Sequence, residues 1–149
     1  MPDKIIFLDV DGVLNCTTTR ARSPSGFVGV MDSKVKLLKQ IVDATGAAVV
    51  LSSDWRLEPE SKDFKYLTQK LKYKGGITLY DMTPDISWAR RGLEIISWLD
   101  DNNPTAFVIL DDTPFSDFER RELSGHVILT DPFYGLTQQE VDWAIENLG

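Results

Sequence analysis

The sequence has few of the residues that build a disulfide framework or a zinc site. Its 149 residues include one cysteine, Cys16, and one histidine, His126. A single cysteine excludes a disulfide within the chain, which is typical of a reducing compartment, and we expect a cytoplasmic protein. Because no cluster of histidines and cysteines is present, the sequence does not favour zinc as a ligand.

Long apolar runs and an excess of positive charge are also lacking. No apolar stretch reaches the roughly 18 residues that a membrane span needs, and no basic segment with an apolar stretch behind it opens the chain, so we expect no membrane association. Lys and Arg number 16 against 23 Asp and Glu, which gives a formal net charge of -7. This charge opposes nonspecific attraction to a polyanion, so a nucleic acid would have to meet a local basic patch.

One candidate patch is present between residues 62 and 74. This stretch contains five lysines and three aromatic residues, namely Lys62, Lys65, Lys70, Lys72, Lys74, Phe64, Tyr66 and Tyr73. It is either a surface for nucleic acid or a helix with a solvated lysine face and its aromatic side chains in the core. The second interpretation is the commoner arrangement and is favoured here.

Length and hydrophobic pattern predict a single α/β domain over residues 1–149. With 42% hydrophobic residues, the chain can bury one core but is too short for two comfortable domains. Apolar runs rich in β-branched residues predict buried strands at 5–8, 47–51, 106–110 and 127–129. Helical spacing predicts helices at about 33–45, 62–74 and 89–101, and a capping box predicts a last helix that starts after Thr137. Strands that alternate with helices indicate a three-layer, Rossmann-like fold around a mainly parallel sheet.

Two segments between the predicted elements have no clear pattern. We expect residues 16–31 to form a small flap and residues 77–88 to form a loop with a short strand. With the preceding helix, residues 57–88 are expected to make at most a small lid or insert. The fold therefore has room for only a minimal cap over any site.

Polar side chains follow three of the predicted strands at their carboxyl ends, where open parallel sheets bind ligands. They form three pairs, namely Asp9 and Asp11, Ser52 and Ser53, and Asp111 and Asp112. A single acidic pair is as often a cap or a turn, but three polar pairs at one edge favour a site. Two carboxylates about 4 Å apart repel by roughly 4 kcal/mol at an effective dielectric of 20, so such a cluster needs a cation or shifted pKa values. Ligands that are all oxygen favour Mg²⁺.

These strands and their polar ends resemble the haloacid dehalogenase (HAD) superfamily of aspartate-based phosphatases. FLDVDGVLN resembles its first motif, VVLSS its second and FVILDD its fourth. More narrowly, the chain is similar to the HAD domain found in Swiss Army Knife RNA repair proteins, through LDVDGVLN, LSSDWR, TPDISWARRGLEIISWL, ILDD and GLT. The resemblance covers most of the chain and implies a HAD-type fold with a minimal cap.

The resemblance implies catalysis through an aspartyl-phosphate. Asp9 would attack phosphorus, and Asp11 would act as the general acid and then the general base. Ser52 would donate a hydrogen bond to a phosphoryl oxygen, with Ser53 as the alternative. In place of the family's usual lysine, Arg91 would balance the charge of the phosphoryl group, although Arg90 is also a candidate.

The resemblance also implies a magnesium site and further contacts to substrate. Mg²⁺ would bind the carboxylates of Asp9 and Asp112 and the backbone carbonyl of Asp11, with Asp111 as a further ligand through water. Three other side chains lie near the motifs. Arg56 is a candidate to fork onto a second phosphate or a substrate carboxylate. Asn15 either hydrogen-bonds the loop of the nucleophile or is a turn asparagine, and Trp55 either walls the pocket or simply packs.

The sequence therefore predicts a Mg²⁺-dependent phosphomonoester hydrolase. An open site suits a phosphate on an RNA or DNA end, and it also admits a nucleotide, whereas partner proteins are not indicated. Two alternatives remain open. The stretch LDDTPFSDF also resembles the carboxy-terminal-domain phosphatases, which act on phosphoproteins, and a non-catalytic phosphate-binding or adaptor module is possible on the same fold.

Overall fold

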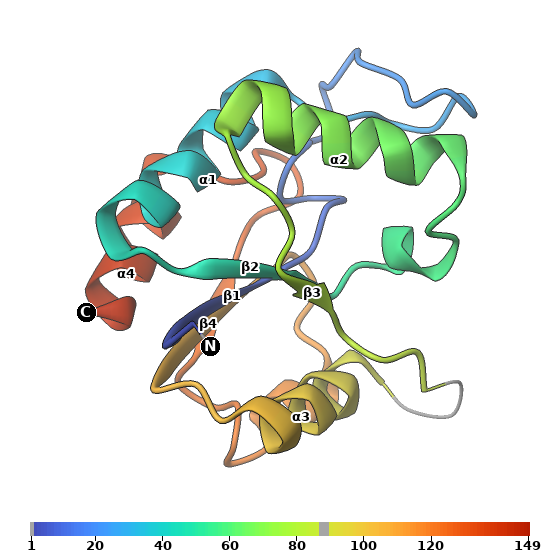
Figure 1. Ribbon diagram of the computed structural model, residues 1–149. Helices are drawn as coiled ribbons and strands as arrows, with labels where there is room; N and C mark the ends of the chain where they lie inside the picture. The colour runs from blue at the N-terminus through green and yellow to red at the C-terminus, as the bar shows by residue number, and fades with distance from the viewer. Residues whose placement is uncertain (1, 87–89) are drawn as a thin grey trace.

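The centre of the molecule is a parallel sheet of five strands in the order β3-β2-β1-β4-β5 (Figure 1). The structure is a computed structural model that describes residues 2–86 and 90–149. The strands are β1 (Lys4–Leu8), β2 (Ala48–Leu51), β3 (Asp81–Met82), β4 (Ala106–Asp111) and β5 (Val127–Leu129). Four of them confirm the predicted strands, and β3 lies in the segment where the sequence predicts a loop with a short strand.

Helices cover both faces of this sheet. They are α1 (Asp32–Thr45), α2 (Lys62–Gly75), α3 (Arg91–Asn102) and α4 (Gln138–Leu148), with the 3₁₀-helices η1 (Asp54–Leu57) and η2 (Ser116–Glu119). Figure 1 shows α1, α2 and α4 on one face and α3 on the other, which confirms the three-layer, Rossmann-like α/β fold. The predicted start of the third helix, at residue 89, lies outside the described residues. Among the described helices, none combines the length and the apolar composition that a bilayer span requires.

The central strand β1 is buried from both sides because its side chains alternate between two hydrophobic cores. Ile6 and Leu8 pack into the core that α1, α2 and α4 cover. Ile5 and Phe7 point the other way, where the Phe7 ring packs edge-to-face on Trp98 of α3. Each such side chain stabilises the fold by roughly 1.5–3 kcal/mol through burial. The residues that follow β1 therefore start from a rigid strand.

The register of the sheet brings three strand ends to one level. Leu8, the last residue of β1, pairs with Leu51 of β2 and with Leu110 of β4. Because all the strands are parallel, the polar residues that follow each of these leucines emerge at the same edge. The sequence pattern anticipates this arrangement, and the register accounts for it.

The segment at 16–31 is a loop that is closed on itself and tied to α2. An antiparallel bridge joins Arg22 to Val28, and the backbone N–H of Ser25 donates to Asp63 Oδ1 at 3.0 Å. We call residues 16–31 the flap. The stretch at 57–88 contains α2, which packs beside α1 and leads the chain from β2 to β3; its function as a lid stays a prediction.

Candidate active site

Three carboxylates gather where β1 and β4 end. Asp9, Asp111 and Asp112 each place one oxygen within 4.8 Å of the others. Asp9 is 4% exposed and Asp111 is fully buried. The pairing of β1 with β4 thus brings together the two acidic pairs that the sequence placed at strand ends.

Burial and mutual repulsion disfavour the ionised form of these acids. Burial raises the pKa of Asp9 from 3.8 to about 8, and the nearby Asp111 carboxylate adds to the effect, while Arg91 opposes it. Burial likewise raises the pKa of Asp111, against the lowering effect of Arg91. One guanidinium does not balance three carboxylates. A set of hard oxygen donors with uncompensated negative charge fits a divalent cation such as Mg²⁺.

Among the residues that the structure describes, Arg91 is the cation that contacts this cluster. Its Nη1 lies 2.7 Å from Asp111 Oδ2 and 3.2 Å from Asp9 Oδ1. Burial alone would lower the pKa of Arg91, but Asp9 and Asp111 outweigh that effect and raise it. Arg90 instead donates to the hydroxyl of Ser116 at 3.0 Å, so of the two candidate arginines only Arg91 contacts the carboxylates.

The start of α3 holds Arg91 in place. Arg91 is the first residue of the helix, and its guanidinium lies 4.8 Å from the ring centroid of Phe115. Asp117 in η2 accepts a hydrogen bond from the backbone N–H of Leu93 at 3.0 Å, which caps the helix from outside. The close approach requires Gly92, because a Cβ atom there would lie 2.5 Å from Asp117 Cγ.

The loop after β1 is shaped by Gly12 and Asn15. Gly12 has a φ of 81°, and a Cβ atom on it would lie 2.1 Å from Asp112 Oδ2. Asn15 Oδ1 accepts from the backbone N–H of Gly12 at 2.8 Å, and its Nδ2 donates to Asp11 Oδ1 and to the carbonyl of Gly29. Asn15 therefore bonds the loop that follows β1, which is the first of the two roles that the sequence left open for it.

Asp11 is the exposed member of the first acidic pair. Its Oδ1 accepts from Asn15 at 3.0 Å, and its Oδ2 accepts from the indole N–H of Trp55 at 3.1 Å. These two donors fix the carboxylate at the mouth of the site. Trp55 thus positions Asp11 as well as walling the adjoining pocket.

The two serines after β2 differ in their bonding. Ser52 is fully buried, and its Oγ has no hydrogen-bond partner among the described residues. Ser53 Oγ accepts from the backbone N–H of Trp55 at 3.2 Å and caps η1. The Ser52 hydroxyl makes no hydrogen bond among the described residues, and the Ser53 hydroxyl accepts one but keeps its own O–H to donate, so both serines remain candidates to bond a phosphoryl oxygen.

Arg56 is buried and fully engaged by the protein itself. It is 5% exposed, and its Nη2 lies 2.9 Å from Glu94 Oε1, which is also buried. Its other donors bond the backbone carbonyls of Ser52, Ser53, Thr83 and Pro84. These contacts favour a structural role, holding together the loops after β2 and β3, over contact with a second phosphate.

Besides Phe115, which contacts Arg91, two further residues that support the site were not identified from the sequence. Glu94 is the buried partner of Arg56, and Thr130 Oγ1 donates to the carbonyl of Gly12 at 2.7 Å. The signal for Glu94 was its place beside Gly92 and Ile95 on the buried side of the predicted third helix. Thr130 follows the last predicted strand but carried no signal of its own.

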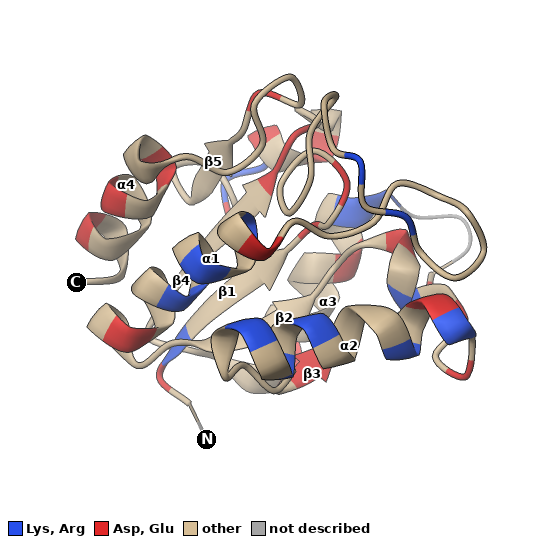
Figure 2. Ribbon diagram, turned by 90° about the horizontal axis from the view of Figure 1, so that it is seen from above, with Lys and Arg blue, Asp and Glu red and all other residues tan. Residues whose placement is uncertain are grey.

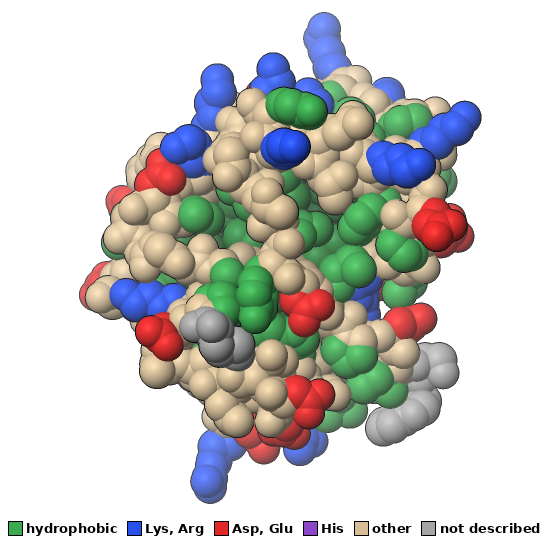
Figure 3. All heavy atoms as spheres, in the orientation of Figure 1, with side chains coloured by type: hydrophobic (Ala, Val, Ile, Leu, Met, Phe, Trp, Pro, Cys, Tyr) green, Lys and Arg blue, Asp and Glu red, His purple; other side chains and the backbone are tan. Residues whose placement is uncertain are grey.

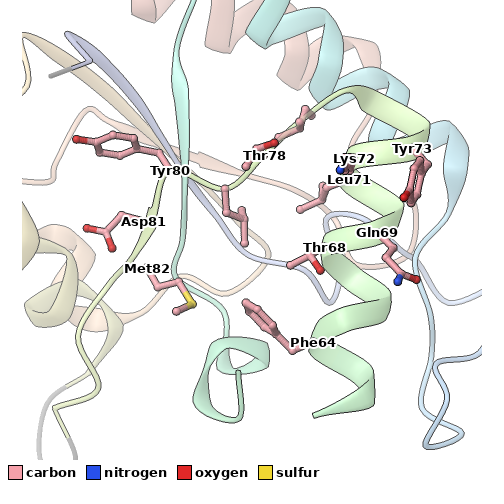
Figure 4. Close-up of a pocket in the computed structure, with 12 residues that line it drawn as sticks. Phe64, Thr68, Gln69, Leu71, Lys72, Tyr73, Thr78, Tyr80, Asp81 and Met82 are labelled. Atoms are coloured by element: carbon pink, nitrogen blue, oxygen red, sulfur yellow. The ribbon is translucent and has the colours of Figure 1, made fainter. Parts of the chain in front are cut away.

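A pocket of about 620 Å³ lies apart from these residues, between α2 and β3 (Figure 4). Figure 3 shows hydrophobic side chains gathered in a hollow over this region, beneath α2. Its lining includes Phe64, Lys72, Tyr73 and Met82 and none of the candidate catalytic side chains. This pocket is therefore separate from the carboxylate cluster.

The lysine-rich stretch forms α2 (Figure 2). Lys70 lies 2.7 Å and Lys74 lies 3.7 Å from the carboxylate of Asp32, so Asp32 neutralises part of the basic face. The hydroxyl of Tyr66 accepts from the backbone N–H of Val30 at 3.1 Å, which ties this ring to the flap. These contacts favour a solvated helix face over a surface built for nucleic acid. The expectation that the aromatic side chains lie in the core is wrong for Tyr73, which is 74% exposed, whereas Phe64 and Tyr66 pack partly buried against the core.

A family model described as "HAD domain in Swiss Army Knife RNA repair proteins" matches residues 5–141. The matched range runs from β1 into α4 and contains all the candidate site residues. No curated protein matches the chain.

Proposed function

Because the chain belongs to the family of HAD domains found in Swiss Army Knife RNA repair proteins, we propose that it is a Mg²⁺-dependent phosphomonoester hydrolase that acts on a nucleic-acid end or a nucleotide. Membership of this family supports a hydrolase of the phosphatase type. The observation that carries the proposal is the contact of Arg91 with Asp9 and Asp111 at the carboxyl edge of a parallel sheet. The metal, the covalent intermediate and the substrate are the parts that experiment must establish.

The carboxylate cluster is the proposed metal site. Asp9 and Asp112 would hold Mg²⁺ together with the backbone carbonyl of Asp11, and Asp111 would be a further ligand. When bound, the cation neutralises charge on the phosphoryl group and shields the nucleophile from it. The fit rests on the donor set, which consists of hard oxygen atoms next to a single arginine.

The chain's own residues supply the nucleophile and the proton transfers. Asp9 attacks phosphorus, and the bond from phosphorus to the leaving oxygen breaks as Asp11 gives that oxygen a proton. Asp11 then takes a proton from the water that attacks the aspartyl-phosphate, so that phosphate leaves and both acids are restored. Arg91 favours the ionised form of Asp9, and the Ser52 hydroxyl donates to a phosphoryl oxygen.

Phosphate release from a panel of substrates tests this function. The panel contains 3′- and 5′-phosphorylated oligonucleotides, free nucleotides and phosphopeptides, each with Mg²⁺ and with EDTA. Wild type is compared with Asp9→Asn, which keeps the shape of the side chain but removes the nucleophile. We expect release from the nucleic-acid substrates in Mg²⁺ only, and none from the variant.

The other outcomes each decide an alternative. Release from phosphopeptides alone would favour a protein phosphatase. Release that persists in Asp9→Asn would overturn the covalent mechanism. If a folded protein that binds Mg²⁺ released phosphate from nothing in the panel, the enzyme proposal would give way to a phosphate-binding module.

A further inference from the structure

A second pocket, of about 540 Å³, adjoins Asp11. The flap, η1 and the first turn of α2 line this open pocket, and these segments lie close together on one side of the molecule (Figure 1). Its lining consists of Asp11, Phe27, Val28, Asp54, Trp55, Leu57, Glu58, Ser61 and Asp63. Because Asp11 is the proposed proton donor to the leaving oxygen, this is where the leaving group of the substrate would lie.

Large hydrophobic side chains are unusually exposed in this pocket. Phe27 is 68% exposed, Leu57 is 45% exposed and Val28 is 39% exposed. Phe27 and Val28 come from the flap and Leu57 comes from η1, so two segments far apart in the sequence present apolar surface to the same space. Apolar surface that gathers beside a reactive group marks a binding site for an apolar body.

The charged groups that line the pocket are all carboxylates. Asp54, Glu58 and Asp63 add three carboxylates to that of Asp11, and neither lysine nor arginine is among the described lining residues. Carboxylates accept hydrogen bonds from hydroxyl and N–H groups but repel a further phosphate. The pocket thus fits a group that is flat or apolar on one side, rich in donors on the other, and free of negative charge.

Hydrogen bonds hold the walls of the pocket before any ligand binds. Asp63 Oδ1 accepts from the backbone N–H of Ser25, which fastens the tip of the flap to α2. Further along the flap, Val30 N–H donates to the hydroxyl of Tyr66, and a Cβ atom on Gly29 would lie 2.6 Å from that hydroxyl. A preformed pocket loses less entropy when a ligand binds.

We propose that this pocket binds the nucleoside that carries the scissile phosphate, with the base against Phe27 and Leu57 and the hydroxyl and N–H groups facing the carboxylates. The inference deepens the proposed function and rests on it, because it assigns the leaving group of the same reaction. A polyol phosphate lacks the flat apolar face. A second phosphate on the nucleoside has to lie outside the pocket, away from these carboxylates.

Substrate preference tests the assignment. The substrates are cytidine 3′-monophosphate, adenosine 3′-monophosphate and glycerol 2-phosphate, measured in Mg²⁺ for wild type, Phe27→Ala, Leu57→Ala and Trp143→Ala. Trp143 lies on α4, is 44% exposed and does not line the pocket, so it is the matched control. Loss of the stacking contact of Phe27 raises KM for the nucleotides about tenfold in Phe27→Ala, and loss of the apolar contact of Leu57 raises it severalfold in Leu57→Ala. KM for glycerol 2-phosphate stays unchanged, and the control behaves as wild type with every substrate.

A 3′-phosphorylated tetranucleotide distinguishes a nucleoside at the end of a nucleic acid from the nucleoside of a free nucleotide. A lower KM than for the free nucleotides assigns the pocket to the terminal residue of a nucleic acid, and a higher one assigns it to a free nucleotide. If Phe27→Ala and Leu57→Ala change KM for glycerol 2-phosphate as much as for the nucleotides, the nucleoside assignment is overturned while the hydrolase proposal stands.

A binding measurement decides the assignment even if nothing is hydrolysed. The indole N–H of Trp55, which donates to Asp11, gives one ¹⁵N–¹H cross-peak that is assigned by its loss in Trp55→Phe. Titration with cytidine and with adenosine in EDTA should move this cross-peak, with affinity about tenfold weaker in Phe27→Ala and unchanged in Trp143→Ala. A cross-peak that neither nucleoside moves overturns the nucleoside pocket, whatever the hydrolase assay shows.

Discussion

A Cβ atom on Gly12 would lie 2.1 Å from Oδ2 of Asp112, so the loop that carries the proposed nucleophile and the loop that carries a proposed metal ligand interlock without space for a methyl group. Gly12 also has a φ of 81°, in the left-handed region. The clash with Asp112 affects the site alone, whereas the left-handed φ disfavours any residue with a side chain at this position. The two effects can therefore be separated by experiment.

The substitution Gly12→Ala should abolish activity by displacing Asp112. We expect a loss of roughly 1–2 kcal/mol in the free energy of unfolding from backbone strain, and a loss of Mg²⁺ binding in isothermal titration. Gly125→Ala is the control, because Gly125 has a φ of 89° and no heavy atom within 4 Å of an added Cβ. It should lose similar stability and keep full activity. Equal Mg²⁺ affinity in the two variants would show that Asp112 does not hold the metal.

The contacts of Arg91 predict a large effect on stability. Arg91→Met removes the partner of two buried carboxylates, and breaking such a pair costs about 3 kcal/mol or more. Urea denaturation without added metal measures this loss. Arg90→Met is the control, since Arg90 is exposed and bonds only Ser116 among the contacts described for it; it should unfold within about 0.5 kcal/mol of wild type. Similar midpoints for both variants would contradict the bridging role.

The thiol of Cys16 should ionise at a lower pH than an ordinary thiol. A hydrogen bond with the Thr18 hydroxyl, 3.3 Å from Sγ, lowers the pKa of Cys16. Because the thiolate is the reactive form, the rate of alkylation by iodoacetamide should reach half its maximum at a lower pH in wild type than in Thr18→Val. Thr17→Val is the control, since the Thr17 hydroxyl bonds the carbonyl of Phe133. The expectation fails if the three midpoints coincide.

The parts of the fold that could be predicted are those encoded by neighbouring residues. An apolar run followed by a polar pair specifies both a buried strand and what emerges from its end, so Asp9, Ser52 and Asp111 were placed at one edge before the register was known. The capping box at the start of α4 is equally local, and the backbone N–H of Thr137 does donate to Glu140 at 2.9 Å. Such signals need no knowledge of packing.

The parts that could not be predicted depend on packing between distant segments. Arg90 and Arg91 are adjacent in sequence, and only the phase of α3 turns Arg91 toward the carboxylates. The pocket beside Asp11 combines the flap with η1, and its apolar members Phe27 and Leu57 form no motif. Three partners of Arg56, namely Thr83, Pro84 and Glu94, come from the loop after β3 and from α3. The sequence motif near the site therefore suggested that Arg56 contacts substrate. In the structure, the protein itself surrounds this side chain.

The buried guanidinium of Arg56 gives the prediction that decides between those two roles. If Arg56 holds the loops after β2 and β3 together, Arg56→Lys should lower the free energy of unfolding by about 3 kcal/mol, because a single ammonium cannot replace a fork of donors to four carbonyls and Glu94. Glu94→Gln should lower it too, since it leaves the buried guanidinium without its counter-charge, although Glu94 contributes no group to the proposed reaction. If Arg56 bound a second phosphate instead, Arg56→Lys would raise KM for doubly phosphorylated substrates with little change in stability, and Glu94→Gln would leave both quantities near wild type. Urea midpoints for the two variants, read beside KM for a nucleoside 3′,5′-bisphosphate and for the 3′-monophosphate, separate a structural arginine from a substrate ligand.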